Sequence, residues 1–145
     1  MANVFDVAQY ILAARGEMTA MKLQKLVYYS QAWSLVWDET PLFGEPIEAW
    51  ANGPVVRDLF EAHRWQFRVR SVSGGDVAKL KKRERETIDA VLAHYGDKSS
   101  QWLSDLTHLE DPWRLARRGI PDGVRGSAVI SLESMAEYYE SISEK

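Results

Sequence analysis

One stretch of the chain limits its fold more than any other. Apolar side chains recur there at steps of three and four, and they are Met21, Leu23, Leu26, Val27, Tyr28, Ala32, Trp33, Leu35, Val36 and Trp37. This spacing predicts an α-helix from Thr19, a good N-cap, to about Trp37. A helix that is apolar over so much of its circumference packs against neighbours on several sides. We therefore expect it to lie at the centre of a mainly α-helical domain.

Capping residues, glycines and prolines divide the remaining chain into shorter elements. Helices are predicted after Asn3, from Pro54, from Leu80 to Tyr95, from Gln101 to Leu109, after an Asp111 cap and after Ser131. Residues 47–51 and 129–130 are expected to be extended, and the alternation in 64–73 fits an exposed hairpin strand. The expected fold class is mainly α. It is a single compact domain over residues 1–145, with six or seven helices and at most a short two- or three-stranded sheet or hairpin.

Length and composition narrow the class of protein. A chain of 145 residues is long enough to build a core without covalent cross-links. The absence of cysteine excludes disulfides, thiolate metal ligands and a thiol nucleophile. No apolar run approaches the roughly 18 residues of a membrane-spanning helix, and Asp6 stands where a secretory signal would carry lysine or arginine. We expect a cytoplasmic protein that does not insert into membranes.

Positive charge is concentrated in the middle of the chain. Residues 57–85 contain nine lysines and arginines but four acidic residues, whereas the whole chain has a formal net charge of −3. Such a region is typical of phosphate-backbone binding, of an acidic protein partner, or of a solvated helix start. The pI of about 5.6 and the lack of a recognition helix favour the solvated surface. Nucleic-acid binding is therefore the weaker hypothesis.

The chain offers little that could support catalysis. Asp105 and His108 have the three-residue spacing of some helical metal sites, but the second acid–histidine pair that such a site requires is missing. A Gly-x-Ser-x-Gly elbow and a nucleotide-binding Gly-Lys-Ser/Thr loop are also missing. We expect neither an enzyme nor a bound metal or cofactor. An enzyme that uses His108 with Asp105 remains the alternative.

Adjacent aromatic residues on the central helix suggest an exposed surface. Tyr28 and Tyr29 are separated by about 100° around a helix, so we expect one of them to lie on the more exposed side. Tyrosine is enriched at protein interfaces because its ring is apolar and its hydroxyl is polar. Lys22 and Lys25 lie on the same helix and are expected to border that surface. Leu26 and Trp33, in contrast, are expected to be core residues.

The same segments carry a resemblance to a known family. The matching residues are Lys22-Leu23-Gln24-Lys25-Leu26, Tyr28-Tyr29, Gln31-Ala32-Trp33, Pro41-Leu42-Phe43, Glu48-Ala49-Trp50 and Gly53-Pro54-Val55-Val56. A weaker cluster includes Leu106-Thr107-His108, Pro112-Trp113 and Tyr138-Tyr139. Together they resemble the Panacea domain antitoxins, which include SocA-like and phage-associated GepA-like proteins. Asn52 departs from the family, which usually has an aromatic residue before the Gly-Pro pair.

The resemblance implies an antitoxin that neutralises the toxin encoded by an adjacent gene through direct protein–protein contact. The alternatives are an adaptor that delivers the toxin to an AAA+ protease and a nucleic-acid-binding regulator, and self-association stays open. The residues expected to contact the toxin are Lys22, Lys25, Tyr28, Tyr29, Asn52 and Arg57. Mainly structural roles are expected for Leu23, Gln24, Leu26, Trp33, Trp50, Gly53, Pro54, Val55, His108, Pro112 and Trp113.

Overall fold

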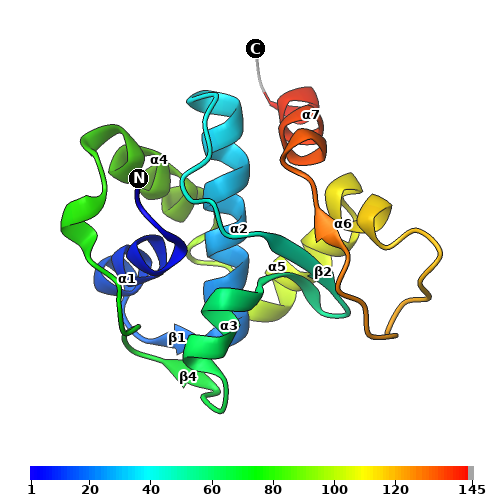
Figure 1. Ribbon diagram of the computed structural model, residues 1–145, viewed down its shortest axis with the longest axis horizontal. Coiled ribbons are helices and arrows are strands. Elements are labelled where there is room, and N and C mark those ends of the chain that lie inside the picture. Colours follow the sequence, from blue (N-terminus) through cyan, green and yellow to red (C-terminus); the bar gives the residue numbers. More distant parts are fainter. Residues whose placement is uncertain (144–145) are drawn as a thin grey trace.

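The computed structural model describes residues 1–143, which form a mainly helical fold (Figure 1). The helices are α1 (Val4–Arg15), α2 (Ala20–Trp37), α3 (Arg57–His63), α4 (Lys82–Tyr95), α5 (Ser100–His108), α6 (Asp111–Ala116) and α7 (Leu132–Ile142), with a 3-10 turn η1 (Val77–Lys79). The strands are β1 (Met18–Thr19), β2 (Ile47–Trp50), β3 (Gly53–Val56), β4 (Arg68–Val69) and β5 (Val129–Ile130). The predicted fold class is confirmed.

Helix α2 is the central element. In Figure 1 it stands between α1 and α4 on one side and α5, α6 and α7 on the other. It packs against α1, α4, α5, α7 and β3, and every residue from Leu23 to Ser34 is buried. This arrangement explains why the helix is apolar around most of its circumference, and it confirms Leu23, Leu26 and Trp33 as core residues.

The expectation of an exposed tyrosine on α2 is wrong. Tyr28 and Tyr29 are 1% and 0% exposed, because different neighbours cover the two faces. The Tyr29 hydroxyl donates to Glu110 Oε1 at 2.7 Å, and the Tyr139 hydroxyl of α7 donates to the same oxygen at 2.7 Å. The hydroxyl oxygens of Tyr28 and Tyr139 lie 3.0 Å apart. The tyrosine pair therefore ties α2 to the C-terminal half of the fold.

Local capping decides most of the helix boundaries. Asn3 and Asp6 form a capping box at α1, and the Thr19 hydroxyl accepts from the Lys22 backbone N–H at 3.1 Å. Ser99 and Ser131 cap α5 and α7 in the same way. Asp111 differs from the prediction. It is the first residue of α6, and the preceding Glu110 occupies the N-cap position without a side-chain cap bond because its carboxylate accepts from the tyrosines.

The short strands form two small antiparallel sheets. In one, β1 pairs with β4, so only Arg68 and Val69 of the expected 64–73 strand are extended. In the other the order is β3-β2-β5. β2 and β3 form a hairpin in which Trp50 pairs with Gly53 and Ala49 with Pro54. This hairpin crosses the middle of α2 in Figure 1 and reaches toward α5.

The proline in this hairpin corrects the sequence interpretation. Pro54 does not begin a helix, because Gly53–Val56 is a strand and α3 starts only at Arg57. β3 is an edge strand, where a residue without an N–H is tolerated. The outward groups of the paired Ala49 bond outside the hairpin, its N–H to Ala128 and its carbonyl to Arg117. Pro54 thus occupies a non-hydrogen-bonded pair position, where the hairpin needs no N–H from it.

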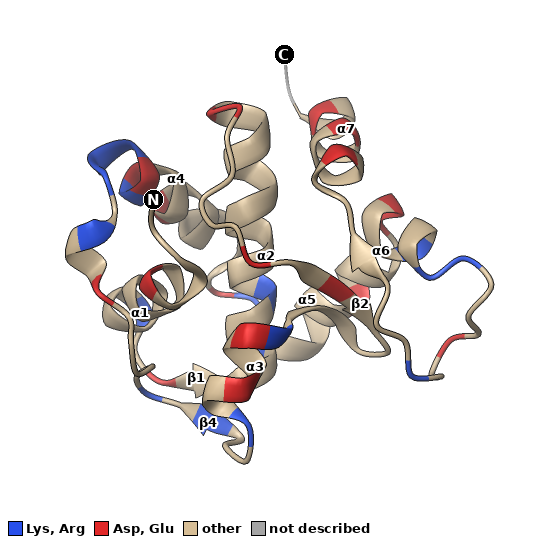
Figure 2. Cartoon of the chain, viewed as in Figure 1, with Lys and Arg blue, Asp and Glu red and all other residues tan. Residues whose placement is uncertain are grey.

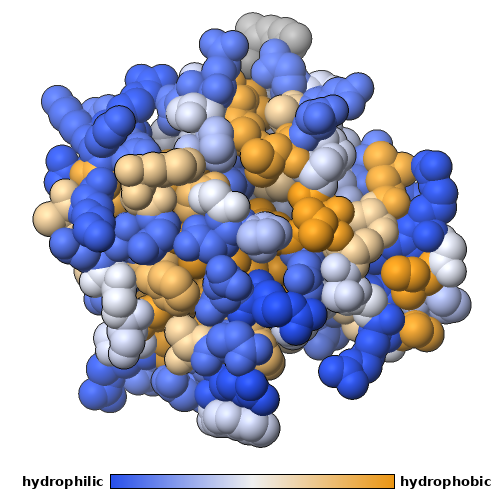
Figure 3. Space-filling model, viewed as in Figure 1, coloured by the Kyte–Doolittle hydropathy of each residue, from blue (hydrophilic) through white to orange (hydrophobic). Residues whose placement is uncertain are grey.

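Most arginines of the basic region form ion pairs with acidic side chains. Arg57 pairs with Glu48 and Arg64 with Glu61, each at 2.9 Å. Arg68 and Arg70 share Glu17, and Arg83 pairs with Asp38. Figure 2 shows acidic and basic positions close together on α3 and around β4, and in Figure 3 hydrophobic side chains reach this face in small separate groups among polar ones. The positive charge is thus partly neutralised.

Candidate functional site

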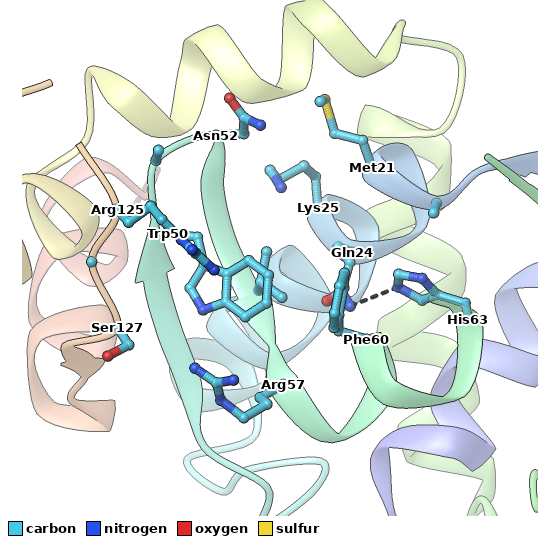
Figure 4. Close-up of a pocket in the computed structure, with 14 residues that line it drawn as sticks. Met21, Gln24, Lys25, Trp50, Asn52, Arg57, Phe60, His63, Arg125 and Ser127 are labelled. Atoms are coloured by element: carbon cyan, nitrogen blue, oxygen red, sulfur yellow. Dashed lines mark hydrogen bonds between the residues drawn. The ribbon is translucent and has the colours of Figure 1, made fainter. Parts of the chain in front are cut away.

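A cavity of about 510 Å³ lies between the N-terminal half of α2, the β2–β3 hairpin and α3 (Figure 4). Residues 125–127, which precede β5, close one side of it. The lining includes Met21, Gln24, Lys25, Trp50, Asn52, Val55, Arg57, Phe60, His63 and Arg125. Its volume falls within the range of about 300–1,000 Å³ for pockets that bind ligands. Both apolar walls and cationic side chains are present.

Gln24 joins the three elements that form the cavity. Its side-chain oxygen accepts from the Val56 backbone N–H at 2.9 Å, and its amide nitrogen donates to the Val56 carbonyl at 3.3 Å. The same nitrogen lies 3.0 Å from His63 Nε2 and donates to it, because an amide nitrogen cannot accept. His63 therefore presents an unprotonated Nε2, and burial lowers the pKa of its imidazole. Gln24 thus replaces the missing neighbour strand at the free edge of β3.

Lys25 is the most unusual side chain of the site. It is 1% exposed, and its Nζ donates to the Pro54 carbonyl at 3.2 Å. Within residues 1–143, no carboxylate forms an ion pair with it. Burial lowers the pKa of Lys25 to about 7 from its ordinary value of 10.5. When it is protonated, Lys25 therefore lacks a charge partner within residues 1–143.

The hairpin turn shapes the space around this lysine. Lys25 extends from α2 toward the turn that contains Asn52 (Figure 4). Gly53 has a φ of +124°, and a Cβ atom added there would lie 2.5 Å from Lys25 Cε and 3.0 Å from Thr107 Oγ1. The positive φ and the close approach both require glycine at this position. The glycine of the Gly-Pro pair therefore makes room for the lysine.

Aromatic side chains form the wall of the cavity next to the hairpin. The Trp50 and Phe60 rings pack edge to face with centroids 4.9 Å apart. Trp50 Nε1 donates to Glu48 Oε1 at 2.9 Å, and the Arg57 guanidinium lies 5.3 Å from the Trp50 ring centroid. Two hydrogen bonds of 2.9 and 3.1 Å bind Arg57 to Glu48. Trp50 is thus fixed at its indole N–H and covered by a guanidinium on one side.

A comparison with known protein families identifies the family of this chain. The family model described as antitoxin SocA-like, Panacea domain, matches residues 23–114. The chain belongs to this family. The matched Panacea segment runs from α2 to α6 and contains the hairpin, α3 and most of the cavity lining, while Ala20 and Met21 precede it and Arg125–Ser127 follow it. Curated proteins and solved structures give no significant match.

The Panacea domain brings together some of the residues predicted to contact a partner and separates others. Lys25, Asn52 and Arg57 line the cavity, together with the predicted structural residues Gln24, Trp50 and Val55. Asn52 and Arg57 are exposed, whereas Lys25 is buried, which corrects the expectation that Lys25 lies on an exposed side. Lys22 is half-buried and does not line the cavity. The two tyrosines lie in the core, as described above.

The second cluster of predicted structural residues supports the hairpin from behind. His108 stacks on Trp113 with ring centroids 4.1 Å apart, and Trp113 Nε1 donates to the Trp50 carbonyl at 2.8 Å. Pro112 is buried in the first turn of α6. Asp105 accepts instead from Gln101 at 2.8 Å, and His108 Nε2 has no hydrogen-bond partner among residues 1–143. Asp105 and His108, the acid–histidine pair of the sequence, thus have different contact partners.

Several residues of the site had no signal in the sequence. Phe60 and His63 lie on the helix that was predicted from Pro54, without a predicted role, and Arg125 lies between the elements predicted after Asp111 and at 129–130. Trp65 and Phe67, which follow α3, are 90% and 80% exposed. Trp65 has a φ of +75°, which is unusual for a bulky residue. Exposure of this kind depends on how α3 docks, and a sequence pattern does not encode that.

Within residues 1–143, no three histidine, aspartate or glutamate side chains gather closely enough to hold a metal ion. The helices of this part of the chain are also too short or too polar to cross a bilayer. The cavity between α2, the hairpin and α3 therefore remains the best candidate for a functional site.

Proposed function

We propose that this protein is an antitoxin that neutralises a toxin encoded by an adjacent gene by binding it directly in the cytoplasm. The observation that carries the proposal is the match of the antitoxin SocA-like Panacea domain to residues 23–114. That segment includes most of the residues that line the cavity, so the family match and the candidate site overlap. Binding of the toxin is sufficient for this role, without a catalytic step.

The side chains of the cavity support binding rather than catalysis. Tryptophan, tyrosine and arginine dominate the energetics of protein interfaces, and Trp50 and Arg57 are stacked at the exposed side of this cavity. Gln24 and His63 are bonded to each other, and Gln24 also holds the backbone of β3. Ser127 is the hydroxyl side chain in the cavity lining, and no hydrogen bond within residues 1–143 joins it to His63 or Lys25 as a catalytic pair would require. We therefore propose a non-enzymatic mechanism.

The charge distribution favours a protein partner over a nucleic acid. Counterion release requires several free cations along a surface, each neutralising a phosphate. In the basic region, Lys79, Lys81, Lys82 and Arg85 form no ion pair within residues 1–143, but Arg57, Arg64, Arg68, Arg70 and Arg83 are paired with carboxylates of this chain. Those carboxylates would repel a phosphate backbone at the same positions. An interface with a folded protein tolerates such pairs at its rim.

Co-expression with the adjacent reading frame tests the proposed function. The reading frame alone should stop growth, and co-expression of this protein should restore it, with the two proteins co-purifying. If the frame is harmless alone, or stays toxic in the presence of this protein, the proposal is wrong. The amount of toxin separates two mechanisms. A constant amount supports neutralisation by binding, while a loss that depends on an AAA+ protease indicates delivery for degradation.

A further inference from the structure

We propose that the cavity beside Lys25 receives an aspartate or glutamate side chain of the toxin, with the Lys25 ammonium as its counter-charge. The inference rests on the proposed function, and it specifies which chemical group of the toxin occupies this site. Lys25 is then the positively charged end of the cavity, and Trp50, Phe60 and Met21 are its apolar sides.

Lys25 has no ion-pair partner among residues 1–143. A buried charge is costly unless a group of opposite charge or several hydrogen bonds compensate it. Lys25 Nζ has three donor positions and the Pro54 carbonyl as its one hydrogen-bond acceptor among residues 1–143. The lysine is 1% exposed, but it forms part of the wall of the cavity. An anion entering this cavity would supply the missing partner.

The charges around the cavity favour a singly charged ligand over a doubly charged one. A phosphate carries up to two negative charges and usually binds through several free donors. Here Arg57 is occupied by both oxygens of Glu48, and the Glu48 carboxylate adds a negative charge beside the Trp50 wall. Arg125, at the edge of the cavity, is the lining cation that is exposed and free of ion pairs within residues 1–143. A singly charged carboxylate fits this balance better than a phosphate.

The size and the apolar lining of the cavity favour a carboxylate that belongs to another protein. The cavity of about 510 Å³ is much larger than one carboxylate, and apolar side chains surround the rest of it. Asn52 and Arg57 are exposed at its rim, so a group that projects from another protein has access. An acidic side chain flanked by apolar residues satisfies both the lysine and the aromatic walls. Charged groups that become buried at an interface in this way also contribute to specificity.

Binding measurements on a lysine variant test the proposal. Lys25→Met keeps the length and volume of the side chain but removes its charge, and Lys82→Met at the exposed start of α4 is the matched control. The dissociation constant for the toxin should rise at least about tenfold in Lys25→Met and stay unchanged in the control. Thermal unfolding of Lys25→Met should occur no earlier than in the wild type. A purely structural role for Lys25 predicts a loss of stability and of binding together.

Substitutions in the toxin identify the carboxylate itself. Each exposed Asp or Glu of the toxin is changed to Asn or Gln and combined with Lys25→Met in a double-mutant cycle. One of them should weaken binding to the wild type about tenfold and have little further effect on the variant. Equal toxin affinity of the wild type and Lys25→Met, or the absence of any coupled carboxylate, overturns this inference alone. Failure of the wild type to bind the toxin overturns the proposed function as well.

A measurement on the unaltered protein covers the case in which Lys25→Met does not fold. In protein with 13C-labelled lysine, the Cε resonance of Lys25 reports its protonation. Toxin binding at about pH 8 should move this resonance toward the charged form, since a nearby carboxylate favours the ammonium. An unchanged resonance in the complex overturns the proposal. A saturable shift with inorganic phosphate but not with the toxin would assign the cavity to a phosphate ligand and also overturn it.

Discussion

At the scale of single residues, the site depends on a glycine and a lysine that come from different elements. Gly53 in the hairpin leaves room for Lys25 of α2, and the Pro54 carbonyl accepts from that lysine. Neither residue is informative alone, because glycine is common in turns and lysine is common on helices. Their proximity in space converts an ordinary turn and an ordinary helix into one end of a cavity.

Gly53→Ala tests this dependence. The added methyl group would meet Lys25 Cε at 2.5 Å, and alanine tolerates the φ of +124° poorly. We expect a loss of about 1–3 kcal/mol in the free energy of unfolding, measured by urea denaturation. Gly74→Ala is the control, because Gly74 also has a positive φ of +84° but open space around it. A similar loss in both variants would show that backbone strain alone matters.

The lysine also predicts a pH dependence of stability. Between pH about 7 and about 10.5 the unfolded chain keeps a proton on Lys25 that the folded chain has lost, so wild-type stability should rise with pH across this window. Lys25→Met lacks this contribution. The variant should therefore have its largest advantage over the wild type near pH 6.5 and lose much of it near pH 9.5, as measured by urea unfolding at both values. Burial and, to a smaller extent, the charge of Lys25 lower the pKa values of His63 and His108.

At the scale of elements, α2 serves as core, as support for a strand and as one wall of the site. Leu26 is fully buried on it, whereas Gln24 and Lys25 on a neighbouring face bond to β3. The positions of the core and the site therefore alternate along one helix. This alternation explains why the sequence pattern could not separate the residues of the candidate site from those of the core.

Leu26→Ala measures the contribution of α2 to the core. Removing a fully buried leucine side chain leaves a space that neighbours fill incompletely, so the free energy of unfolding should fall by about 2–5 kcal/mol. Trp33→Ala, at 9% exposure, belongs to the same class. Leu109→Ala, at 72% exposure, serves as the surface control and should stay within about 0.5 kcal/mol of the wild type in chemical denaturation. A small effect at Leu26 would contradict the central position of α2.

Local signals account for the part of the fold that was predicted. The boundaries of α1, α2, α5 and α7 follow from Asn3, Thr19, Ser99 and Ser131, because a cap acts within one helical turn. Gly53–Val56 was predicted as a turn and a helix start, since a proline after a glycine fits that pattern equally well. Its strand conformation depends on β2 and on side chains of α2, which lie far away in the sequence.

At the scale of the whole molecule, a buried network connects the two ends of the chain. Glu110, just before α6, accepts hydrogen bonds from Tyr29 of α2 and Tyr139 of α7. Burial raises the pKa of this carboxyl. The sequence placed Tyr138 and Tyr139 on the helix after Ser131 and in the weaker family cluster, but no local pattern shows which tyrosine meets a carboxylate 29 residues away.

Tyr139→Phe tests whether this network holds α7 in place. The ring stays, but the buried Glu110 carboxylate loses one of its two tyrosine donors, so the expected cost is about 1–3 kcal/mol in urea unfolding. Tyr138→Phe is the matched control on the next residue, which is half-buried and whose hydroxyl does not bond to Glu110. Equal stability of the two variants would mean that α7 is held by apolar packing alone.

Side chains of α2 cover the free edge of β3, and this limits how another chain can bind there. An edge strand with free backbone groups is a template on which a strand of another chain can extend the sheet. Gln24 bonds both the N–H and the carbonyl of Val56, and Lys25 bonds the carbonyl of Pro54, so this template is already occupied. Addition of a strand at this edge is blocked as long as the two side chains keep their hydrogen bonds. Any protein that meets the molecule here has to recognise it through side chains and not through a shared sheet.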